Sequence, residues 1–361
     1  MKKVLVLGAT GSIGTNTLDI ARKMPESFSI CGLSAHSNSK KLKELCEEFN
    51  CKGVLTSFDS KDCIKQLIEQ TAPDIVVNGI AGSAGLLPSK TVIEHGIDLA
   101  LANKETVVMA WSLIKDLAKK SGSKIIPVDS EHSAVFNLIN QAGNKNVDSI
   151  IITASGGPFR EYNKKDLEKV TVKDALKHPT WNMGKKITID SATLANKGLE
   201  VIEACRLFDR PVQKVKVVVH PQSLIHSLIR TNDGMLYAQI SDPTMKHPIF
   251  SALTYPENKK SPLEPFELFD QTMTFYKPRF EDFPMLKYAY EAAENEKSYT
   301  IVYNAANEVA VSAFLEERIT FTKIPLIVKK VLDKDWTSEI KSFDDVFEQD
   351  LKARNYAQEE L

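Results

Sequence analysis

The sequence predicts an α/β protein with three parts: an N-terminal Rossmann-like parallel sheet domain, a central α+β domain and a small C-terminal helical domain. Three observations lead to this prediction. The first 150 or so residues alternate short apolar runs with helical stretches. From about Val147, strand-like runs mix with fewer helices and longer loops, and from Pro284 onward the pattern is helical.

The N-terminal elements alternate strand and helix in a regular order. The predicted elements run through Val4–Leu7, Thr15–Lys23, Phe28–Ser34, Lys40–Phe49, Gly53–Leu55, Asp62–Gln70, Asp74–Asn78, Ser89–His95, Asp98–Leu101, Trp111–Lys120 and Lys124–Val128. Strands separated by helices indicate right-handed crossovers and therefore a parallel sheet. The strands are continuous apolar runs without alternation, which is typical of strands covered on both faces.

The later elements predict two further domains. Strand-like runs occur at Ser149–Thr153, Lys186–Ile189, Lys214–Val219 and Met235–Ile240, and clear helical patterns occur at Leu286–Glu296, Ile301–Leu315 and Ile324–Leu332. Prolines punctuate the stretch between these two groups, which shows little periodicity. We therefore expect domains at 1–147, 148–253 and 284–361, with a linker at 254–283.

Composition excludes several classes of protein. The 361 residues carry 46 Lys and Arg against 47 Asp and Glu, a net charge of −1, so nothing indicates a nucleic-acid partner. No apolar run is long enough to span a membrane, and the apolar N-terminus is too short for a signal peptide. We expect a cytoplasmic protein, or a plastid one if a transit peptide has been removed. The five cysteines form no CxxC pair, which argues against disulfides and against a cysteine-rich zinc site.

A glycine-rich loop follows the first predicted strand and opens the first helix. It reads Gly8-Ala9-Thr10-Gly11-Ser12-Ile13-Gly14, a GxxGxxG variant of the dinucleotide-binding fingerprint. Glycines there allow a tight turn, close approach to a pyrophosphate and packing of the helix on the strand. The helix N-terminus supplies free N–H groups for the phosphates. The alternative is a glycine-rich turn in an ordinary α/β domain.

The segment after the second predicted strand indicates which dinucleotide binds. NAD sites usually place Asp or Glu there to hold the ribose diol. Residues 33–41 contain no carboxylate, but they include Ser37, Asn38 and two lysines, Lys40 and Lys41. A carboxylate would repel a 2′-phosphate, so this segment favours NADP(H). Alternatively, the two lysines open a solvated helix.

Two acidic motifs far apart in the sequence suit a hard cation. Asp129 and Glu131 follow a predicted strand, and in extended backbone they would point to the same side. Glu200 and Glu203 share one face of a predicted helix. Converging carboxylates without Cys or His spacing suit Mg²⁺ or Mn²⁺. From spacing alone, ordinary acidic pairs on surface turns and helices, which are common, are the favoured explanation of these motifs.

A second set of polar residues suits an anion other than the cofactor. Ser155-Gly156-Gly157 follows an apolar strand, and Ser191, Asn196 and Lys197 add a hydroxyl, an amide and an ammonium group. Between them, residues 178–186 carry Trp181, Met183 and Gly184, a composition that fits a lid. The alternative for the Trp and Met is ordinary domain packing.

Taken together, these motifs resemble the 1-deoxy-D-xylulose 5-phosphate reductoisomerase family. The resemblance spans about 300 residues. The matching stretches are GATGSIG at 8–14, LANKET at 101–106, PVDSEHSA at 127–134, SGGPF at 155–159, HPTWNMGKKITIDSATLANKGLEVIEA at 178–204, HPQSLIHS at 220–227 and NAANEVAV at 304–311. It implies a homodimeric, NADPH-dependent oxidoreductase with a central catalytic domain. The expected reaction converts 1-deoxy-D-xylulose 5-phosphate to 2-C-methyl-D-erythritol 4-phosphate by metal-assisted rearrangement and hydride transfer, in non-mevalonate isoprenoid biosynthesis.

The resemblance also implies roles for individual residues. The implied metal ligands are Asp129, Glu131 and Glu200. Glu203 lies in the same acidic patch, and we expect it to contact the ligands and not the metal. The implied cofactor contacts are Gly8, Thr10, Gly11, Ser12, Ile13, Ser37, Asn38, Asn103, Glu105, Met183 and Gly184. The implied substrate contacts are Lys104, Ser130, Glu131, Ser155, His178, Trp181, Ser191, Asn196, Lys197 and Glu200. Lys104 and Glu131 are the expected catalytic residues. The family often has a Lys where this chain has Ser37.

Two other functional classes fit part of the sequence. A plain NADP-dependent dehydrogenase, such as a semialdehyde or homoserine enzyme, would share the first strand–helix–strand unit but need no metal. A redox-sensing nucleotide-binding module would use the glycine loop without catalysis, but it would leave the acidic motifs and the second anion site unexplained.

Overall fold

The computed structural model describes residues 1–181 and 183–361, and its chain divides into two compact units. The first unit comprises residues 1–106, 112–133 and 244–267, and the second comprises 107–111, 134–243 and 268–361. The C-terminal helices therefore belong to the same unit as the second sheet. The three functional domains expected from the sequence, with a linker at 254–283, stay a prediction.

A six-stranded parallel sheet forms the centre of the first unit, as the sequence predicts. Its strand order is β3-β2-β1-β4-β5-β6. The strands are β1 (Lys2–Leu7), β2 (Phe28–Ala35), β3 (Lys52–Leu55), β4 (Ile75–Asn78), β5 (Asp98–Leu101) and β6 (Ile125–Pro127). The order reverses between β1 and β4, which is the switch point where open α/β sheets bind ligands. Val4 to Leu7 on the central β1 are completely buried, as expected of a strand covered on both faces.

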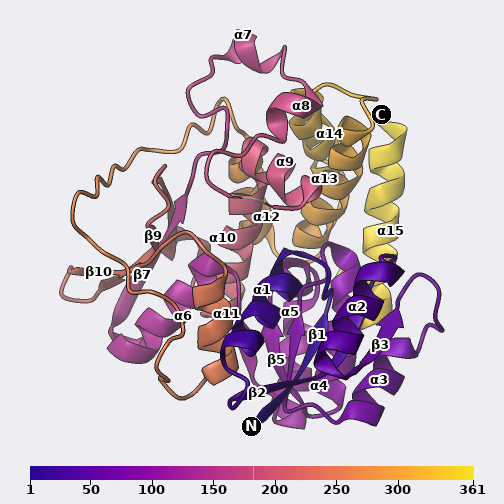
Figure 1. Ribbon diagram of the computed structural model, residues 1–361. Helices are drawn as coiled ribbons and strands as arrows, with labels where there is room; N and C mark the ends of the chain where they lie inside the picture. Colours follow the sequence, from indigo (N-terminus) through magenta and orange to yellow (C-terminus); the bar gives the residue numbers. More distant parts are fainter. Residues whose placement is uncertain (182) are drawn as a thin grey trace. The chain divides into compact units, whose positions relative to one another are not determined.

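Helices connect these strands and lie around the sheet (Figure 1). They are α1 (Ser12–Lys23), α2 (Ser39–Phe49), α3 (Cys63–Thr71), α4 (Leu86–Glu94), both ends of α5 (Lys104–Ser121) and the start of α6 (Ser130–Ala142), while α11 (Lys246–Thr254) returns to this unit from later in the chain. Most predicted elements are confirmed to within a few residues. The predicted helix at Trp111–Lys120 is longer, because the Asn103 side chain caps a helix that begins at Lys104.

Helix α5 has a break at Ala110, and a half-buried arginine donates hydrogen bonds to two carbonyl groups just before it. Ala110 has non-helical backbone angles, φ −137° and ψ 24°. Arg206 donates to the carbonyls of Val107 and Val108 at 2.7 and 2.5 Å. Burial lowers the pKa of Arg206 to about 10, so the side chain stays charged at neutral pH. Residues 107–111 belong to the second unit, as does Arg206.

The second unit contains a mixed four-stranded sheet and a group of helices. The sheet order is β10-β9-β7-β8, in which only β7 and β8 are parallel. The strands are β7 (Val147–Ala154), β8 (Val215–Val219), β9 (Ile225–Thr231) and β10 (Leu236–Ile240). The helices are α7 (Lys164–Leu167), α8 (Val172–Ala175), α9 (Lys185–Thr193), α10 (Ala195–Leu207), α12 (Met285–Asn295), α13 (Tyr299–Leu315), α14 (Lys323–Leu332) and α15 (Phe343–Glu359).

One predicted strand in this unit is wrong. The run Lys186–Ile189 is rich in β-branched residues, but it lies in helix α9. Gly184 is the N-cap, and the Thr188 hydroxyl donates to the Gly184 carbonyl at 2.8 Å. Thr188, Ile189 and Ala192 are buried, so packing overrides the strand propensity of the run. Strand β9 and helices α11 and α15 were not singled out from the sequence.

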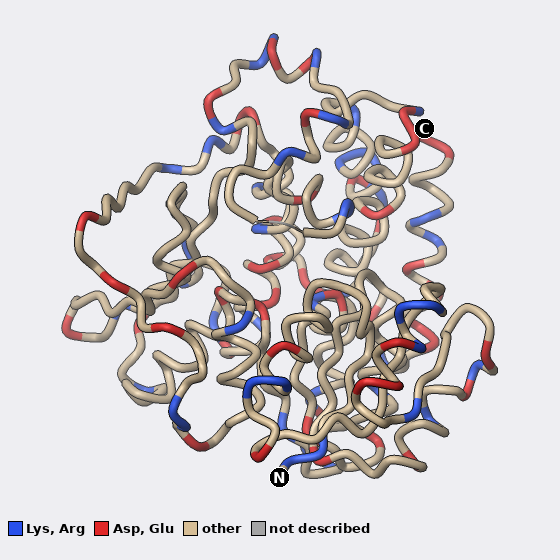
Figure 2. The backbone as a smooth tube through the Cα atoms, in the orientation of Figure 1, with Lys and Arg blue, Asp and Glu red and all other residues tan. Residues whose placement is uncertain are grey.

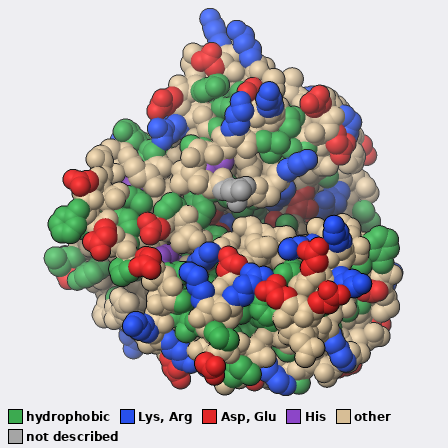
Figure 3. All heavy atoms as spheres, in the orientation of Figure 1, with side chains coloured by type: hydrophobic (Ala, Val, Ile, Leu, Met, Phe, Trp, Pro, Cys, Tyr) green, Lys and Arg blue, Asp and Glu red, His purple; other side chains and the backbone are tan. Residues whose placement is uncertain are grey.

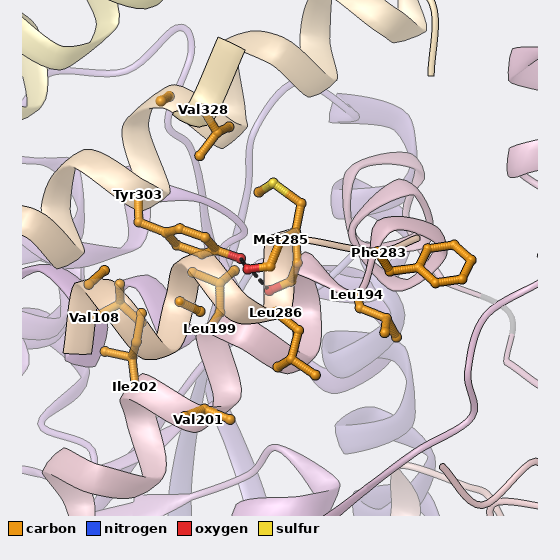
Figure 4. Packing of buried hydrophobic residues seen from close by; sticks show 14 of the residues in the cluster. Val108, Leu194, Leu199, Val201, Ile202, Phe283, Met285, Leu286, Tyr303 and Val328 are labelled. Atoms are coloured by element: carbon orange, nitrogen blue, oxygen red, sulfur yellow. Dashed lines mark hydrogen bonds between the residues drawn. The ribbon is translucent and has the colours of Figure 1, made fainter. Parts of the chain in front are cut away.

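The core of the second unit joins helices from distant parts of the chain. Figure 4 shows Leu199 and Ile202 of α10, Leu286 of α12 and Tyr303 of α13 within one hydrophobic cluster. The C-terminal helices therefore pack on the helix that carries Glu200. This packing fixes α10 in place, because buried side chains interdigitate at crystal-like density.

Charged groups of both signs are interspersed along the backbone (Figure 2) and on the face drawn in Figure 3. The net charge of −1 thus reflects mixing of the two signs. Among the described residues, no helix has the combination of length and apolar character that a membrane span needs.

Candidate functional site

The glycine loop has the geometry that its spacing predicts. Gly8 has φ +79°, and a Cβ atom there would lie 2.9 Å from the Gly79 carbonyl oxygen. A Cβ on Gly14 would lie 2.5 Å from the Gly8 carbonyl oxygen. Gly11 is the N-cap of α1 and provides no side-chain cap. The loop therefore needs glycine at 8 and 14 and leaves the start of α1 open to an anion.

The residues that follow β2 form the start of α2. The Asn38 side chain caps this helix by accepting from the Lys41 N–H at 3.1 Å. Lys40 and Lys41 are exposed in its first turn, which agrees with the alternative that they open a solvated helix. The contacts of Ser37 and Asn38 to a 2′-phosphate stay a prediction.

Asn103 holds the turn that follows β4. Its Nδ2 atom donates to the carbonyls of Ile80 and Gly82 at 2.9 and 2.8 Å, and it also lies 2.9 Å from Glu105 Oε2. Its Oδ1 atom accepts from the Thr106 N–H at 2.9 Å. Because β4 ends at the switch point, Asn103 and Glu105 shape the region where a dinucleotide binds in this class of sheet.

Asp129 is a half-buried carboxylate between a lysine and a histidine at the end of β6. Lys104 Nζ lies 2.6 Å from Oδ2, and His132 Nδ1 lies 3.1 Å from Oδ1. Burial alone would raise the pKa of Asp129, but Lys104 and His132 outweigh it and hold that pKa well below its usual range. Asp129 is therefore an anion at every physiological pH.

The backbone at Glu131 is helical, which the sequence did not predict. The expectation of extended backbone through Asp129 and Glu131 is wrong, because helix α6 begins at Ser130. Glu131 lies in the first turn of this helix, where the macrodipole favours a negative charge. Its Oε2 atom accepts from the Ser130 hydroxyl at 2.5 Å.

In the second unit, a histidine links two of the predicted anion-binding serines. His178 Nε2 lies 3.0 Å from Ser155 Oγ and 3.1 Å from Ser191 Oγ. Its Nδ1 atom accepts from the backbone N–H groups of Thr180 and Trp181 at 3.1 and 2.9 Å. Burial lowers the pKa of His178 to about 4, so the ring is neutral near pH 7. Since Nδ1 accepts, Nε2 carries the proton, which leaves the serine hydroxyl protons available to an anion.

The glycine turn after β7 packs directly on α9. Gly156 and Gly157 have φ of +85° and +69°. A Cβ on Gly157 would lie 2.8 Å from the Ser191 carbonyl oxygen. The turn that carries Ser155 and the helix that carries Ser191 are therefore in close contact, which only glycine allows.

Helix α10 presents its polar groups in one cluster at its N-terminal end. Asn196 Nδ2 donates to Glu200 Oε1 at 2.6 Å, and Lys197 Nζ donates to Glu200 Oε2. Lys197, Glu200 and Glu203 are almost fully buried, and both glutamates lie on one helix face as predicted. Asn196 and Lys197 thus contact a carboxylate in this structure.

The predicted lid is partly described. Residue 182, within the predicted lid at 178–186, lies outside the described residues, and Lys185 and Lys186 already belong to α9. Trp181 is half-buried, with its ring 6.3 Å from that of His226 in an edge arrangement. Met183 is half-buried and Gly184 is exposed. The closure of this segment over a substrate stays a prediction.

Sequence reasoning assigned no role to Asp190 or Asn307, although both lie in motifs that it quoted. Asp190 is buried on α9, and the Asn307 amide reaches it from α13. For Asp190, the available signal was its place directly before Ser191 in the sequence.

Comparison with known proteins identifies the family. The family described as 1-deoxy-D-xylulose 5-phosphate reductoisomerase matches residues 4–63 and 54–111, and two descriptions of its C-terminal domain match 125–208 and 240–356. The 1-deoxy-D-xylulose 5-phosphate reductoisomerase of Treponema denticola is 49% identical over 367 residues, covering 99% of this chain and 96% of that protein. The chain belongs to the 1-deoxy-D-xylulose 5-phosphate reductoisomerase family. The resemblance inferred from the motifs is confirmed.

Other members of this family agree along the full chain. The enzyme of that name from Thermodesulfovibrio yellowstonii is 46% identical and covers all of both chains. A crystal structure of DOX-P reductoisomerase with NADPH, fosmidomycin and magnesium has a TM-score of 0.92 at 36% identity, covering 100% of this chain and 98% of that one. The Zymomonas mobilis enzyme in complex with NADPH has a TM-score of 0.88 at 38% identity, covering 99% and 98%. The predicted α/β fold class is therefore confirmed.

Proposed function

We propose that this protein converts 1-deoxy-D-xylulose 5-phosphate to 2-C-methyl-D-erythritol 4-phosphate with NADPH, as an oxidoreductase of non-mevalonate isoprenoid biosynthesis. The single observation that carries the proposal is the family match along the whole chain. It includes the glycine loop, both acidic motifs and the serine–histidine cluster. Neither a plain dehydrogenase nor a nucleotide sensor accounts for all of these elements.

The glycine loop and the end of β4 would hold the dinucleotide. Gly8, Gly11 and Gly14 let the backbone approach a pyrophosphate, and α1 directs its N-terminal N–H groups toward it. A related enzyme has been crystallised with NADPH. The bound cofactor supplies hydride. The chain positions it through Thr10, Ser12, Ile13, Asn103 and Glu105, with Ser37 and Asn38 near the 2′-phosphate and Met183 and Gly184 closing over it.

Asp129, Glu131 and Glu200 would together hold one Mg²⁺ or Mn²⁺ ion, each offering one carboxylate oxygen. The donor set fits, because hard divalent cations prefer oxygen ligands and these three residues offer only oxygen. When bound, the ion supplies Lewis-acid stabilisation of negative charge on the substrate oxygens. Lys104 holds Asp129 in place and provides a positive charge nearby. Glu131, the other expected catalytic residue, accepts from Ser130 and is a candidate to move a substrate proton.

The substrate phosphate would bind in the second unit. Ser155 and Ser191 offer hydroxyl protons, oriented by the neutral ring of His178. Asn196 and Lys197 add an amide and a positive charge from α10, and Trp181 covers the bound substrate. Binding of this unreactive end fixes the reacting carbons and uses remote binding energy to do so.

We also propose that the chain acts as a cytoplasmic homodimer. Edge strand β10 exposes Leu236, Tyr237 and Ile240 by 48%, 47% and 39%, and Figure 3 shows hydrophobic side chains gathered at this part of the drawn face. An exposed apolar edge strand is a liability that a second copy would cover.

The test is NADPH oxidation with 1-deoxy-D-xylulose 5-phosphate, with and without added Mg²⁺ or Mn²⁺. We expect metal-dependent oxidation and a branched product, which carbon-labelled substrate identifies. Glu200→Gln should abolish turnover at ordinary metal concentrations and leave NADPH binding nearly intact. Full activity after metal removal, or reduction without carbon rearrangement, would contradict the proposal.

A further inference from the structure

Helix α9 contains a buried carboxylate that the proposed chemistry does not use. Asp190 is 1% exposed. Its Oδ2 atom lies 2.8 Å from Lys186 Nζ, and its Oδ1 atom accepts from Asn307 Nδ2 at 2.7 Å. Burying a carboxylate is costly unless hydrogen bonds and an opposite charge compensate it, so both partners matter for the position of α9.

The two partners of Asp190 stabilise different things: Lys186 stabilises the helix, and Asn307 stabilises its packing. Lys186 lies one turn earlier on the same helix, so its ion pair with Asp190 stabilises α9 itself. Asn307 lies on α13, 117 residues further along the chain. The Asn307–Asp190 hydrogen bond is therefore a tertiary bond that fixes α9 against the C-terminal helices.

Helix α13 provides a second anchor one turn earlier. The Tyr303 hydroxyl lies 3.1 Å from the Met285 carbonyl oxygen, a bond drawn in Figure 4, and 3.4 Å from the Ala195 carbonyl oxygen. Ala195 is the first residue of α10, directly after Leu194, whose φ of +62° separates α9 from α10. Tyr303 and Asn307 thus hold the two sides of this elbow from one helix face, four residues apart.

The elbow carries the groups that we assign to the substrate phosphate. Ser191 follows Asp190 directly, and the Gly157 turn packs on the Ser191 backbone. Asn196 and Lys197 begin α10 just after the elbow. A displacement of α9 would move the Ser191 hydroxyl away from His178 and from the Ser155 turn.

We propose that Asn307 is a positioning residue for phosphate binding: its bond to Asp190 fixes α9, so that Ser191 is held ready to donate to the substrate phosphate. This inference rests on the proposed function, because it uses the assignment of Ser191 to the phosphate. Asn307 itself contacts neither substrate nor cofactor in this proposal.

The test compares two buried asparagines on the same helix. Asn304 and Asn307 are both fully buried, but the bonds of Asn304 go to Met109 Sδ and to Glu308. We expect Asn307→Leu to raise the KM for the ketose phosphate and the inhibition constant of inorganic phosphate about tenfold, with kcat changed much less. Asn304→Leu should lower the melting temperature about as much as Asn307→Leu does. It should leave the KM for the ketose phosphate and the inhibition constant of phosphate near their wild-type values. Equal effects of the two variants on KM would overturn the inference.

An exchange of side chains separates positioning from general stability. Asn307→Asp alone places two carboxylates together and should raise KM. Adding Asp190→Asn restores an amide–carboxylate pair and should lower KM again, whereas a purely additive loss would contradict the inference. This comparison also tests the positioning role if the Asn307→Leu variant does not fold.

Ser191→Ala distinguishes failure of the inference from failure of the phosphate assignment. If Ser191→Ala raises KM and Asn307→Leu does not, only the positioning role is wrong. If Ser191→Ala leaves KM and phosphate inhibition unchanged, the assignment of Ser191 is wrong, and the positioning role is wrong with it.

Discussion

Lys104 Nζ donates a 2.6 Å hydrogen bond to Asp129 Oδ2, and the two side chains are only 7% and 13% exposed. The pair combines a residue of the LANKET motif with a proposed metal ligand. Because a buried carboxylate needs compensation, Lys104 stabilises the folded protein as well as the proposed site.

Replacing Lys104 by methionine should destabilise the protein. Lys104→Met removes the positive charge and leaves Asp129 with less compensation, at a cost of about 3 kcal/mol in the free energy of unfolding. Chemical denaturation of the metal-free protein measures this change. The double variant Lys104→Met/Asp129→Asn should regain most of the loss, because the carboxylate charge that Lys104 compensates is then absent. A double variant as unstable as the sum of the singles would argue against this explanation.

The neutral state of His178 predicts how stability depends on pH. The pKa of His178 is lowered to about 4 in the folded protein, whereas an unfolded histidine titrates near 6.5. Between these values the unfolded chain binds the extra proton, so stability falls as the pH falls from about 6.5 to about 4. The difference in free energy of unfolding between wild type and His178→Gln should change over this range. A constant difference would show that His178 has an ordinary pKa.

Removing the negative charge of Glu200 should favour phosphate binding in the absence of metal. Asn196 and Lys197 both donate to the Glu200 carboxylate, which competes with an incoming anion. Metal-free Glu200→Gln should therefore bind inorganic phosphate several times, roughly fivefold, more tightly than metal-free wild type. Calorimetric titration gives both affinities, and weaker binding by the variant would mean that Lys197 does not reach the phosphate.

Gly198 should not tolerate alanine. A Cβ at this position would lie 2.5 Å from the Tyr303 hydroxyl and 2.6 Å from Ala289 Cβ. We expect Gly198→Ala to lower the free energy of unfolding by about 1–3 kcal/mol through overpacking. Tyr303→Phe removes one of the two clashing groups, so the double variant should be more stable than additivity predicts. If the changes in the free energy of unfolding of the two single variants simply add in the double variant, the clash does not involve the Tyr303 hydroxyl.

The fold was largely predictable because the first sheet follows simple periodicity. Strands such as β1 are continuous apolar runs, and each is followed by an amphipathic helix. The failures have physical causes. Ile187, Thr188 and Ile189 favour a strand locally, but they lie in α9, which packs in the core. Strand β9 contains buried His226 and Ser227, which interrupt the apolar pattern.

Only those parts of the site that lie within one sequence motif were predictable. The residues of each motif, such as Asn196, Lys197 and Glu200, meet at helical spacing. Contacts between motifs depend on tertiary structure. The Ser155–His178 contact joins residues 23 apart, and the Asp190–Asn307 bond joins residues 117 apart. No local pattern specifies such pairs.

The central claim is that Asp129, Glu131 and Glu200 hold one divalent ion. Electron paramagnetic resonance of Mn²⁺ binding to the NADPH-loaded protein tests it most directly, with Glu200→Gln compared against Glu203→Gln. Both glutamates are 1% exposed on the same helix, so the pair is matched for burial and charge. We predict one tight Mn²⁺ per chain, weakened at least about tenfold by Glu200→Gln and much less by Glu203→Gln, since removing a ligand costs more than removing a neighbouring group. Equal affinities for wild type and Glu200→Gln would contradict the claim.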